Sequence, residues 1–314
     1  MYEDPDEAWI IDTFRGVGPA LPGLVAGIGD DAALFDDGRF VTVDTMVEGV
    51  HWDHRLDPED VGWKLVAVNV SDAAAMGGRP EWAVLSLSLP SPLDRDWVRA
   101  FSRGLRAACD RWGVTLVGGD TTRAPARMAS LTLMGRADHP VRRSGGRPGD
   151  WVFVTGTLGL AAEAFLADTP RDAASAAFRR PIPPVELAQA LAATGRVTAM
   201  MDLSDGLLTD LSRLCVASGC GATIDPAAIP GDAPLAWRVG FGEDYQLLFT
   251  TGATDADGVP SVARMYGVEV SLVGRLESTR GVRRADGEPW PPPLFAHFMS
   301  PEGRSPPSEL EKPR

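Results

Sequence analysis

The chain has 314 residues, 44% of them hydrophobic, and a formal net charge of −13 at pH 7. This length and composition predict a globular protein of about two domains, each able to bury a core. The negative charge argues against nucleic acid as a partner, because phosphate contacts need clustered Lys and Arg. The sequence has no uninterrupted apolar run of about 18 residues, so we expect no membrane span.

The cysteines and the first residues bear on the cellular compartment. Cys109, Cys215 and Cys220 form no CxxC pair, which argues against a disulfide framework and against a zinc site. Residues 1–7 are acidic and lack the basic and apolar regions of a signal peptide. We therefore expect a cytoplasmic protein.

The lysines exclude two common ways of binding ATP. The sequence contains only Lys64 and Lys312, and neither follows a glycine. A Walker A loop and the strand lysine of protein kinases are therefore absent. An acidic site can still bind phosphates when divalent cations lie between the negative charges.

The first expected elements are a short amphipathic helix over residues 7–14 and an alternating strand over 40–43 that ends at Asp44. Between them, Gly-Ile-Gly-Asp-Asp-Ala-Ala-Leu places Asp30 and Asp31 beside glycines that allow a ligand to approach the backbone. Asp is a poor strand former, so Asp44 predicts a carboxylate at the rim of a sheet. The alternative is a turn and a hairpin, with Asp as ordinary turn chemistry.

The next expected element is a helix that is capped by Asp57 and ends near Met76. Pro58 at its first position and the acids that follow favour this start, and a glycine pair ends the pattern. Asp72 lies within this helix among small apolar residues. A carboxylate in such surroundings costs free energy unless it is paired or bound to a metal.

Three strands are expected after this helix, over residues 82–89, 115–117 and 128–134. A helix capped by Asp94 separates the first two, and Gly119 and Asp120 follow the second. The segment 142–150 is rich in Gly, Pro and charge, which is typical of an exposed connection between domains. The predicted parts of the chain are domains over 1–140 and 141–300 and a disordered tail over 301–314.

Two acidic segments follow in the second half of the chain. A strand over 197–201 leads into Asp202-Leu203-Ser204-Asp205-Gly206, which opens a helix. Further on, Gly-Phe-Gly-Glu-Asp-Tyr over 240–245 precedes a strand that ends at Phe249. In both segments acids lie next to glycines, where a ligand can approach the backbone.

Aspartates therefore occur beside glycines, at strand ends or among small apolar residues at five places: Asp30/Asp31, Asp44, Asp72, Asp120 and Asp202/Asp205. Asp has a short, rigid arm that suits Mg²⁺, which takes oxygen ligands in near-octahedral geometry. A solvated turn explains any one of these residues equally well, but it explains all five places together poorly. If the carboxylates converge, cations must separate them, because they would repel one another strongly at protein-like dielectric.

A series of motifs along residues 10–300 carries a resemblance to a known family: GIGDDAAL, VTVDTMVEGVHW, NVSDAAAMGGRP, LVGGDTTR, RSGGRPGD, MDLSDGLLTDL and GFGEDYQL. The series resembles the thiamine-monophosphate kinase family, within the superfamily that includes aminoimidazole ribonucleotide synthetase. Single motifs such as SDG occur across that superfamily. The pair VDT…GVHW and GEDYQL points to the thiamine kinases.

The resemblance implies a two-domain α+β fold of the aminoimidazole ribonucleotide synthetase type. The N-terminal sheet would pair with that of a second copy in a homodimer, and the C-terminal domain would be an α/β sandwich. The active site would lie in the cleft near the dimer interface. The implied reaction is phosphorylation of thiamine monophosphate by ATP, giving ADP and thiamine diphosphate, with several Mg²⁺ ions.

The resemblance also implies roles for individual residues. The Mg²⁺ ligands would be Asp30, Thr42, Val43, Asp44, Asp72, Asp120, Asp202 and Asp205. The ATP contacts would be Gly119, Asp120, Arg143 and Ser204. The contacts to thiamine monophosphate would be His51, Glu243 and Phe295. Phe295 follows Leu294, where the family usually has glycine.

The chemistry of the residues agrees with direct phosphoryl transfer. The acceptor phosphate has a second pKa of about 6, so one oxygen is already anionic at neutral pH. No general base or nucleophile is required, and neither GxSxG, a Cys/His pair nor HExxH is present, so no catalytic side chain is assigned. The remaining barrier is repulsion between two polyanions, which metal ions and in-line positioning overcome.

Alternatives remain at this stage. From the residues alone, His51 could be a core or surface histidine, Arg143 could be solvated, and Glu243 could belong to a turn. A selenophosphate synthetase would need an early reactive Cys, but the first is Cys109, and the hydrogenase-maturation dehydratase would end in Cys, whereas this chain ends in Arg314. Aminoimidazole ribonucleotide synthetase and a non-catalytic nucleotide-binding relative stay open, although an Asp at every ligand position speaks against a decayed site.

Overall fold

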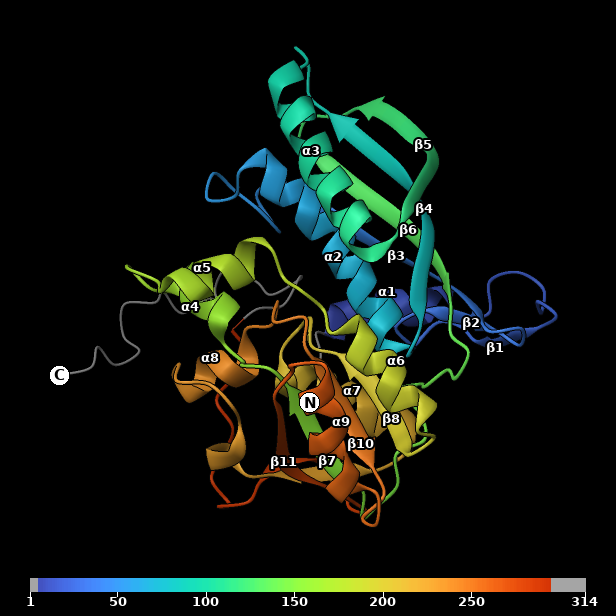
Figure 1. The fold of residues 1–314 in the computed structure, drawn as a ribbon, viewed down its shortest axis with the longest axis vertical. Coiled ribbons are helices and arrows are strands. Elements are labelled where there is room, and N and C mark those ends of the chain that lie inside the picture. Colours follow the sequence, from blue (N-terminus) through green and yellow to red (C-terminus); the bar gives the residue numbers. More distant parts are fainter. Residues whose placement is uncertain (1–4, 295–314) are drawn as a thin grey trace.

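The computed structural model describes residues 5–294, and within them the chain folds into two six-stranded sheets with helices packed on them (Figure 1). In Figure 1 the sheet from the first half of the chain lies above the sheet from the second half. Phe295 and the predicted tail over 301–314 lie outside the described residues. The predictions made for them stay predictions, as do the domain limits near residue 140.

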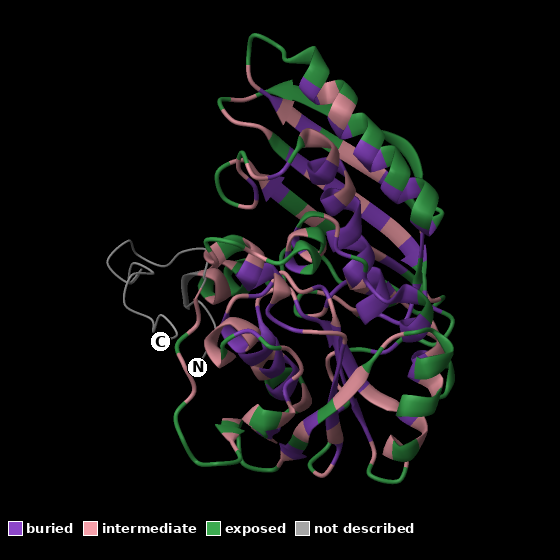
Figure 2. Cartoon of the chain, turned by 60° about the vertical axis from the view of Figure 1, so that its left-hand side comes forward, coloured by how far each residue is buried: buried purple, intermediate pink, exposed green. Residues whose placement is uncertain are grey.

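The first sheet has the strand order β1-β2-β3-β6-β4-β5. β4 and β5 run parallel, and the other neighbours run antiparallel. In β3 and β6 buried residues alternate with exposed or half-buried ones, so helices cover one face while the other face is open (Figure 2). The elements of this half are α1 (Pro5–Phe14), β1 (Leu24–Ala26), β2 (Ala33–Phe35), β3 (Arg39–Val47), α2 (Pro58–Ala75), β4 (Arg79–Leu89), α3 (Arg95–Trp112), β5 (Thr115–Arg123) and β6 (Met128–Arg136).

The second sheet has the strand order β12-β9-β11-β7-β10-β8, and in it β12 and β9 form the parallel pair. Its adjacent interior strands β7 and β10 are almost entirely buried. Its strands are β7 (Trp151–Thr155), β8 (Val197–Asp202), β9 (Gly221–Ile224), β10 (Leu247–Thr251), β11 (Val270–Glu277) and β12 (Gly281–Arg284). Its helices are α4 (Leu160–Leu166), α5 (Asp172–Arg179), α6 (Val185–Ala193), α7 (Leu207–Ser218), α8 (Leu235–Gly240) and α9 (Val259–Met265), with 3-10 turns η1 (Pro226–Ala228) and η2 (Ala256–Gly258).

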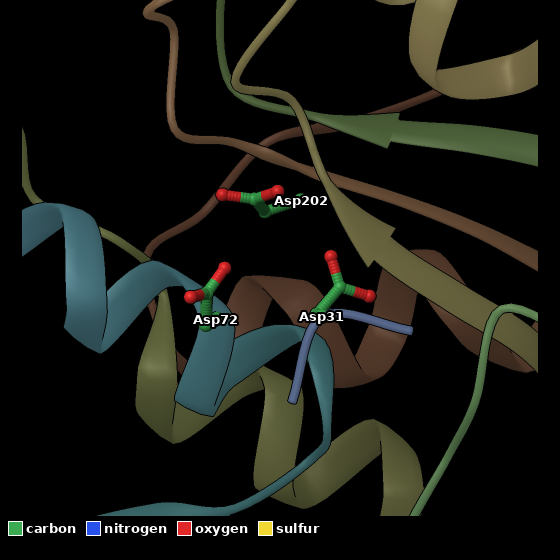
Figure 3. Close-up of side chains that lie close together, drawn as sticks. All are labelled: Asp31, Asp72 and Asp202. Carbon is green, nitrogen blue, oxygen red and sulfur yellow. The ribbon is translucent and has the colours of Figure 1, made fainter. Parts of the chain in front are cut away.

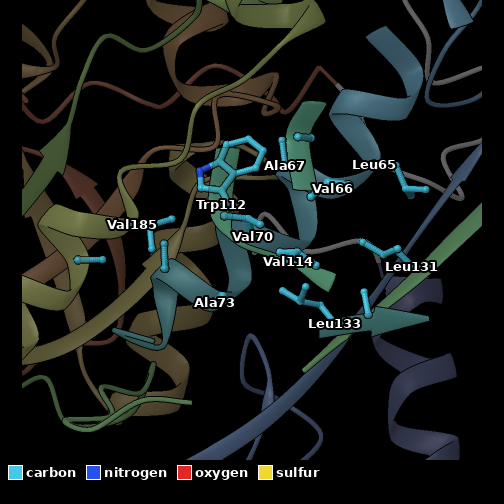
Figure 4. Close-up of a cluster of buried hydrophobic side chains, with 14 of the residues drawn as sticks. Leu65, Val66, Ala67, Val70, Ala73, Trp112, Val114, Leu131, Leu133 and Val185 are labelled. Atoms are coloured by element: carbon cyan, nitrogen blue, oxygen red, sulfur yellow. The ribbon is translucent and has the colours of Figure 1, made fainter. Parts of the chain in front are cut away.

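α2 is the helix on which both halves pack. It begins at Pro58, directly after the predicted cap Asp57, and it is buried along most of its length. It contacts α3, β3 and β6 of the first half and α6 and β8 of the second. Figure 4 shows Val66 and Val70 of α2 in one buried cluster with Leu133 of the first sheet and Val185 of α6. A shared apolar core therefore fixes the position of α2 between the two halves.

α2 and α3 approach so closely that two glycines have no room for a side chain. A Cβ on Gly104 would lie 1.7 Å from the carbonyl oxygen of Glu59, and one on Gly62 would lie 2.1 Å from that of Phe101. Gly104→Ala is therefore expected to lower the free energy of unfolding by about 2–3 kcal/mol, because the helices must move apart. Urea unfolding would measure this loss, with exposed Ser102→Ala as the control, and an unchanged midpoint for Gly104→Ala would contradict the packing.

Three local predictions are wrong. β3 does not end at Asp44 but runs on to Val47, because it pairs residue by residue with β6, and tertiary pairing outweighs the low strand propensity of Asp. β5 likewise continues through Gly119 to Arg123 alongside β4. The segment 142–150 is not fully exposed: Asp150 is buried, and the backbone N–H of Gly146 donates to Ser218 on α7.

No helix within residues 5–294 combines the length and the apolar character that crossing a bilayer would require.

Candidate active site

A cavity of about 260 Å³ opens where α2, β3, the end of β8 and the loop before β10 meet. One part of its wall is acidic and another is aromatic. The acidic and polar lining residues are Glu7, Asp44, Thr45, His51, Asp72, Asp202, Ser204, Asp205 and Glu243. The apolar and aromatic ones are Met46, Val50, Val68, Phe165, Phe178, Phe241 and Tyr245. Seven of the residues predicted from sequence therefore line one cavity: Asp44, His51, Asp72, Asp202, Ser204, Asp205 and Glu243.

Three carboxylates meet beside this cavity (Figure 3). Each of Asp31, Asp72 and Asp202 offers an oxygen that lies within 4.8 Å of the other two. They come from the loop before β2, from α2 and from the end of β8, so segments far apart in sequence supply them. Hard carboxylate oxygens at this spacing suit Mg²⁺.

Neighbouring groups hold these three carboxylates in place. The Thr42 hydroxyl donates to Asp72, and the Ser71 hydroxyl donates to Asp202 at 2.7 Å. The Arg143 guanidinium donates to both oxygens of Asp31, at 2.8 and 3.1 Å. The cluster is therefore oriented before any cation binds.

The electrostatic cost of the cluster appears in its pKa values. Burial, together with the Asp31 carboxylate, raises the pKa of Asp202 to about 7. Burial, with Asp205 and Asp31 as neighbours, raises the pKa of Asp44 to about 6, and burial beside Asp44 and Asp202 raises the pKa of Asp72 well above its ordinary value. These carboxyl groups therefore hold protons more tightly than free aspartates do, and a divalent cation would compete with the protons for the same oxygens.

Asp30 and Asp31 have different surroundings, although only Asp30 was predicted as a metal ligand. Asp30 accepts a hydrogen bond from the backbone N–H of Arg143 at 3.2 Å, and burial raises its pKa to about 6. Asp31, which was not among the predicted ligands, is the one that joins the carboxylate cluster. The Arg143 side chain is largely buried and paired with Asp31, so it is not a solvated linker residue.

The two residues predicted beside Asp44 on β3 lie on opposite faces of the sheet. Thr42 is buried, and its hydroxyl oxygen, which donates to Asp72, also lies 3.1 Å from the backbone carbonyl oxygen of Asp31. The Val43 side chain is 59% exposed on the open face, so only its backbone is near the acidic residues. The backbone N–H of Asp44 itself donates to the side-chain amide of Asn69 on α2 at 3.1 Å.

Gly119 and Asp120 lie apart from this cavity within the chain. They are on the edge strand β5, and the row Asp44–Leu131–Leu85–Gly119 crosses four adjacent strands. Three strand spacings correspond to roughly 14 Å. The close packing explains the glycine, because a Cβ there would lie 1.8 Å from the Leu85 carbonyl oxygen.

His51 and Glu243 line the same cavity as the carboxylates. The His51 Nδ1 accepts a hydrogen bond from the backbone N–H of Val47 at 3.1 Å, so a neutral ring carries its proton on Nε2. A carboxylate oxygen of Glu243 accepts from the Lys64 ammonium at 2.8 Å. The next residue, Asp244, is not a free turn residue: it accepts hydrogen bonds from the Gly159 N–H at the start of α4, and burial raises its pKa to about 7.

Sequence reasoning missed two parts of the site. One is the aromatic wall, where the Phe165 ring lies 5.5 Å from Phe241 and 6.1 Å from Phe178. The other is Arg213, which pairs with the predicted ligand Asp205 and with Glu7 of α1. The aromatic wall had one signal in the sequence, since Phe241 belongs to the glycine-rich acidic segment 240–245. Arg213 had no such signal.

The chain is similar to proteins of known family. The family model "AIR synthase related protein, N-terminal domain" matches residues 29–137, and "AIR synthase related protein, C-terminal domain" matches residues 147–286. The thiamine-monophosphate kinase of Salmonella typhimurium is 37% identical over 277 residues, covering 80% of this chain and 84% of that one. The Escherichia coli K12 enzyme is 36% identical, covering 88% and 92%.

Solved structures agree. A structure described as "AaThiL complexed with AMPPCP and TMP" has a TM-score of 0.78 at 31% identity and covers 93% of this chain and 96% of that one. The thiamine-monophosphate kinase of Stenotrophomonas maltophilia K279a has a TM-score of 0.73 at 34% identity, with 90% and 95% covered. The predicted two-domain α+β fold is confirmed. The chain belongs to the thiamine-monophosphate kinase family.

Proposed function

We propose that this protein transfers the terminal phosphoryl group of ATP directly to thiamine monophosphate, giving ADP and thiamine diphosphate. The observation that carries the proposal is one cavity whose lining combines Asp72 and Asp202 of the carboxylate cluster with aromatic rings, His51 and Glu243. The acidic residues suit metal-bound phosphates, and the aromatic residues suit a flat, cationic ring system. The names of the relatives support the same reaction.

The residues fit Mg²⁺ as the cofactor. Buried oxygen donors with raised pKa values are a destabilising arrangement that a divalent cation would relieve. We propose that Asp31 joins the previously predicted ligands, which are Asp30, Thr42, Val43, Asp44, Asp72, Asp120, Asp202 and Asp205. When bound, Mg²⁺ would neutralise the charge on the phosphates of both substrates.

The remaining residues would bind and orient the substrates. A phosphate oxygen of thiamine monophosphate forms the new bond to the γ-phosphorus, and the bond between that phosphorus and the β–γ bridging oxygen breaks, so ADP leaves with the electron pair. The acceptor oxygen is already anionic, so no side chain has to remove a proton. We propose that Arg143 and Ser204 contact ATP, and that His51, Glu243 and the predicted Phe295 hold thiamine monophosphate.

We infer that Gly119 and Asp120 complete the site of a second copy in a homodimer. Two observations support this: Asp120 lies on the exposed edge strand, about three strand spacings from Asp44, and the open face of the same sheet exposes Val43 and Val117. Such a face and edge suit pairing between two copies. Cytoplasmic location remains our proposal, supported by three buried free cysteines, which suit a reducing compartment.

Turnover tests the proposed function. Purified protein with ATP, Mg²⁺ and thiamine monophosphate should release one ADP for each thiamine diphosphate, with both products followed by chromatography. Omission of thiamine monophosphate or of Mg²⁺ should stop ADP release. ADP release with no thiamine diphosphate would refute the proposal.

A further inference from the structure

Lys64 is a buried ammonium group that the phosphoryl transfer described above does not use. Its side chain is 1% exposed, and it is the only lysine among residues 5–294. Lysine is almost never fully buried unless it is paired, because desolvating the charge is costly. The pairing partner therefore indicates what the residue does.

Both contacts of the ammonium lead to the wall of the cavity. Nζ donates to Oε2 of Glu243 at 2.8 Å and lies 4.0 Å from the ring centroid of Phe178. Glu243 and Phe178 both line the cavity, one as an acid and one as part of the aromatic wall. Lys64 thus contacts two side chains that line the cavity, although it is not a lining residue itself.

The position of Lys64 on α2 follows from helical spacing. Lys64, Val68 and Asp72 are four residues apart, so they lie on one face of the helix. Val68 and Asp72 line the cavity themselves. One helix face therefore supplies a carboxylate at the metal-binding end and an ammonium at the other end.

The loop that carries Glu243 has an unusual backbone. Glu243 and Tyr245 have positive φ angles of 58° and 48°, a region that costs free energy for residues other than glycine. Hydrogen bonds from the two backbone N–H groups to the carbonyls of Ser204 and Leu203, at 2.8 and 2.9 Å, hold this conformation. These bonds fix the loop backbone against the end of β8 but leave the Glu243 carboxylate to be oriented by Lys64.

We propose that Lys64 is a positioning residue that fixes the Glu243 carboxylate, and through it determines the affinity for thiamine monophosphate. The inference rests on the proposed function. With Oε2 occupied by the ammonium, Oε1 is the oxygen that accepts a hydrogen bond from the substrate. Without Lys64, the partly exposed carboxylate turns toward water and the contact is lost.

Steady-state kinetics on Lys64→Met, Lys64→Arg and Glu243→Gln test the proposal. Lys64→Met keeps most of the length of the side chain and removes the charge, and it should raise KM for thiamine monophosphate by about tenfold or more. KM for ATP should stay within about twofold of wild type, because Lys64 has no contact with the acidic cluster. Lys64→Arg should recover most of the loss, since a guanidinium also pairs with a carboxylate.

Two further variants separate positioning from a general structural effect. In Lys64→Met/Glu243→Gln, KM should equal that of Glu243→Gln alone, because Lys64 acts through that carboxylate. Val66→Ala, a buried position on another face of α2, is the matched control: it should lower Tm and leave KM unchanged. Glu243→Gln changes a side chain that is 21% exposed and keeps the test possible if Lys64→Met does not fold.

The outcomes are distinct. An unchanged KM for thiamine monophosphate in folded Lys64→Met, or equal losses for both substrates, would overturn the inference while leaving the proposed function intact. If Lys64→Met does not fold, a wild-type KM in Glu243→Gln would overturn it. Absence of thiamine diphosphate with the wild-type protein would refute the proposed function itself, and the role of Lys64 with it.

Discussion

Asp72→Asn is expected to slow phosphoryl transfer strongly and at the same time to raise the thermal stability of the metal-free protein. Asp72 is half-buried beside Asp31 and Asp202, and desolvation together with the Asp44 carboxylate raises its pKa well above the ordinary value. An amide keeps an oxygen to accept the Thr42 hydrogen bond but carries no charge. Activity should fall by about 10²–10³-fold, since electrostatic stabilisation at the reacting phosphates is lost.

The stability change has a defined pH dependence. The pKa of Asp202 is about 7 and that of Asp44 about 6, above the ordinary value of 3.8, so between about pH 4 and 7 the native state binds more protons than the unfolded state. Stability from these groups is therefore present below pH 4 and is lost as the pH rises through 6 and 7. Asp72→Asn should raise Tm at pH 8 by about 2–4 °C for each kcal/mol of repulsion removed, and by less at pH 5.

Thermal unfolding with and without Mg²⁺ measures this prediction. Wild type should gain stability from Mg²⁺ at pH 8 and much less at pH 5, where protons compete for the carboxylates. Asp72→Asn should gain little at either pH. Asp110→Asn, an exposed Asp on α3, is the matched control and should behave like wild type. A variant that is less stable than wild type at pH 8 and still active would contradict the account of the cluster.

The second large effect is expected in mixed dimers. If Asp120 completes the site of the second copy, a dimer of Asp44→Ala with Asp120→Ala contains one site in which both residues are intact. Each homodimer should be inactive, whereas the purified heterodimer should have about half of the wild-type activity. The spacing of roughly 14 Å between these positions within one chain is the reason for this expectation.

The reciprocal mixture makes the test decisive. A dimer of wild type with the double variant Asp44→Ala/Asp120→Ala should be inactive, because each site then lacks one carboxylate. If both residues acted within one chain, the results would be exchanged: no activity in the first mixture and about half in the second. Two different affinity tags allow each heterodimer to be isolated, and light scattering confirms that it is a dimer.

Much of the fold could be predicted from sequence because its signals are local. The cap Asp57, Pro58 and the glycines after the helix predicted α2 nearly to the residue, and Asp94 caps α3 as expected. The predicted strand ends were wrong where pairing with a neighbouring strand determines how far the strand runs. β3 and β5 continue through Asp44 and Gly119 because neighbouring strands satisfy their backbone groups, which no local pattern reveals.

The site was predictable in composition more than in geometry. Seven residues that the motifs predicted line one cavity. Whether Asp30 or Asp31 joins the carboxylate cluster, however, depends on the turn at Gly29, whose φ is 115°. Adjacent side chains point in different directions, and only the folded loop decides which one joins the cluster. Phe165 and Phe178 look like ordinary helix residues in sequence, and only the packing of α4 and α5 beside the loop before β10 brings them to the cavity.

The central claim is direct transfer of one phosphoryl group from ATP to thiamine monophosphate. The most direct measurement uses ATP labelled at the γ-phosphorus, with the full-length protein and Mg²⁺, and follows the label. We predict that all transferred label appears in the terminal phosphate of thiamine diphosphate, with one ADP for each product molecule and no label on the protein. Label released as free phosphate, or retained on the protein with no thiamine diphosphate formed, would contradict the account.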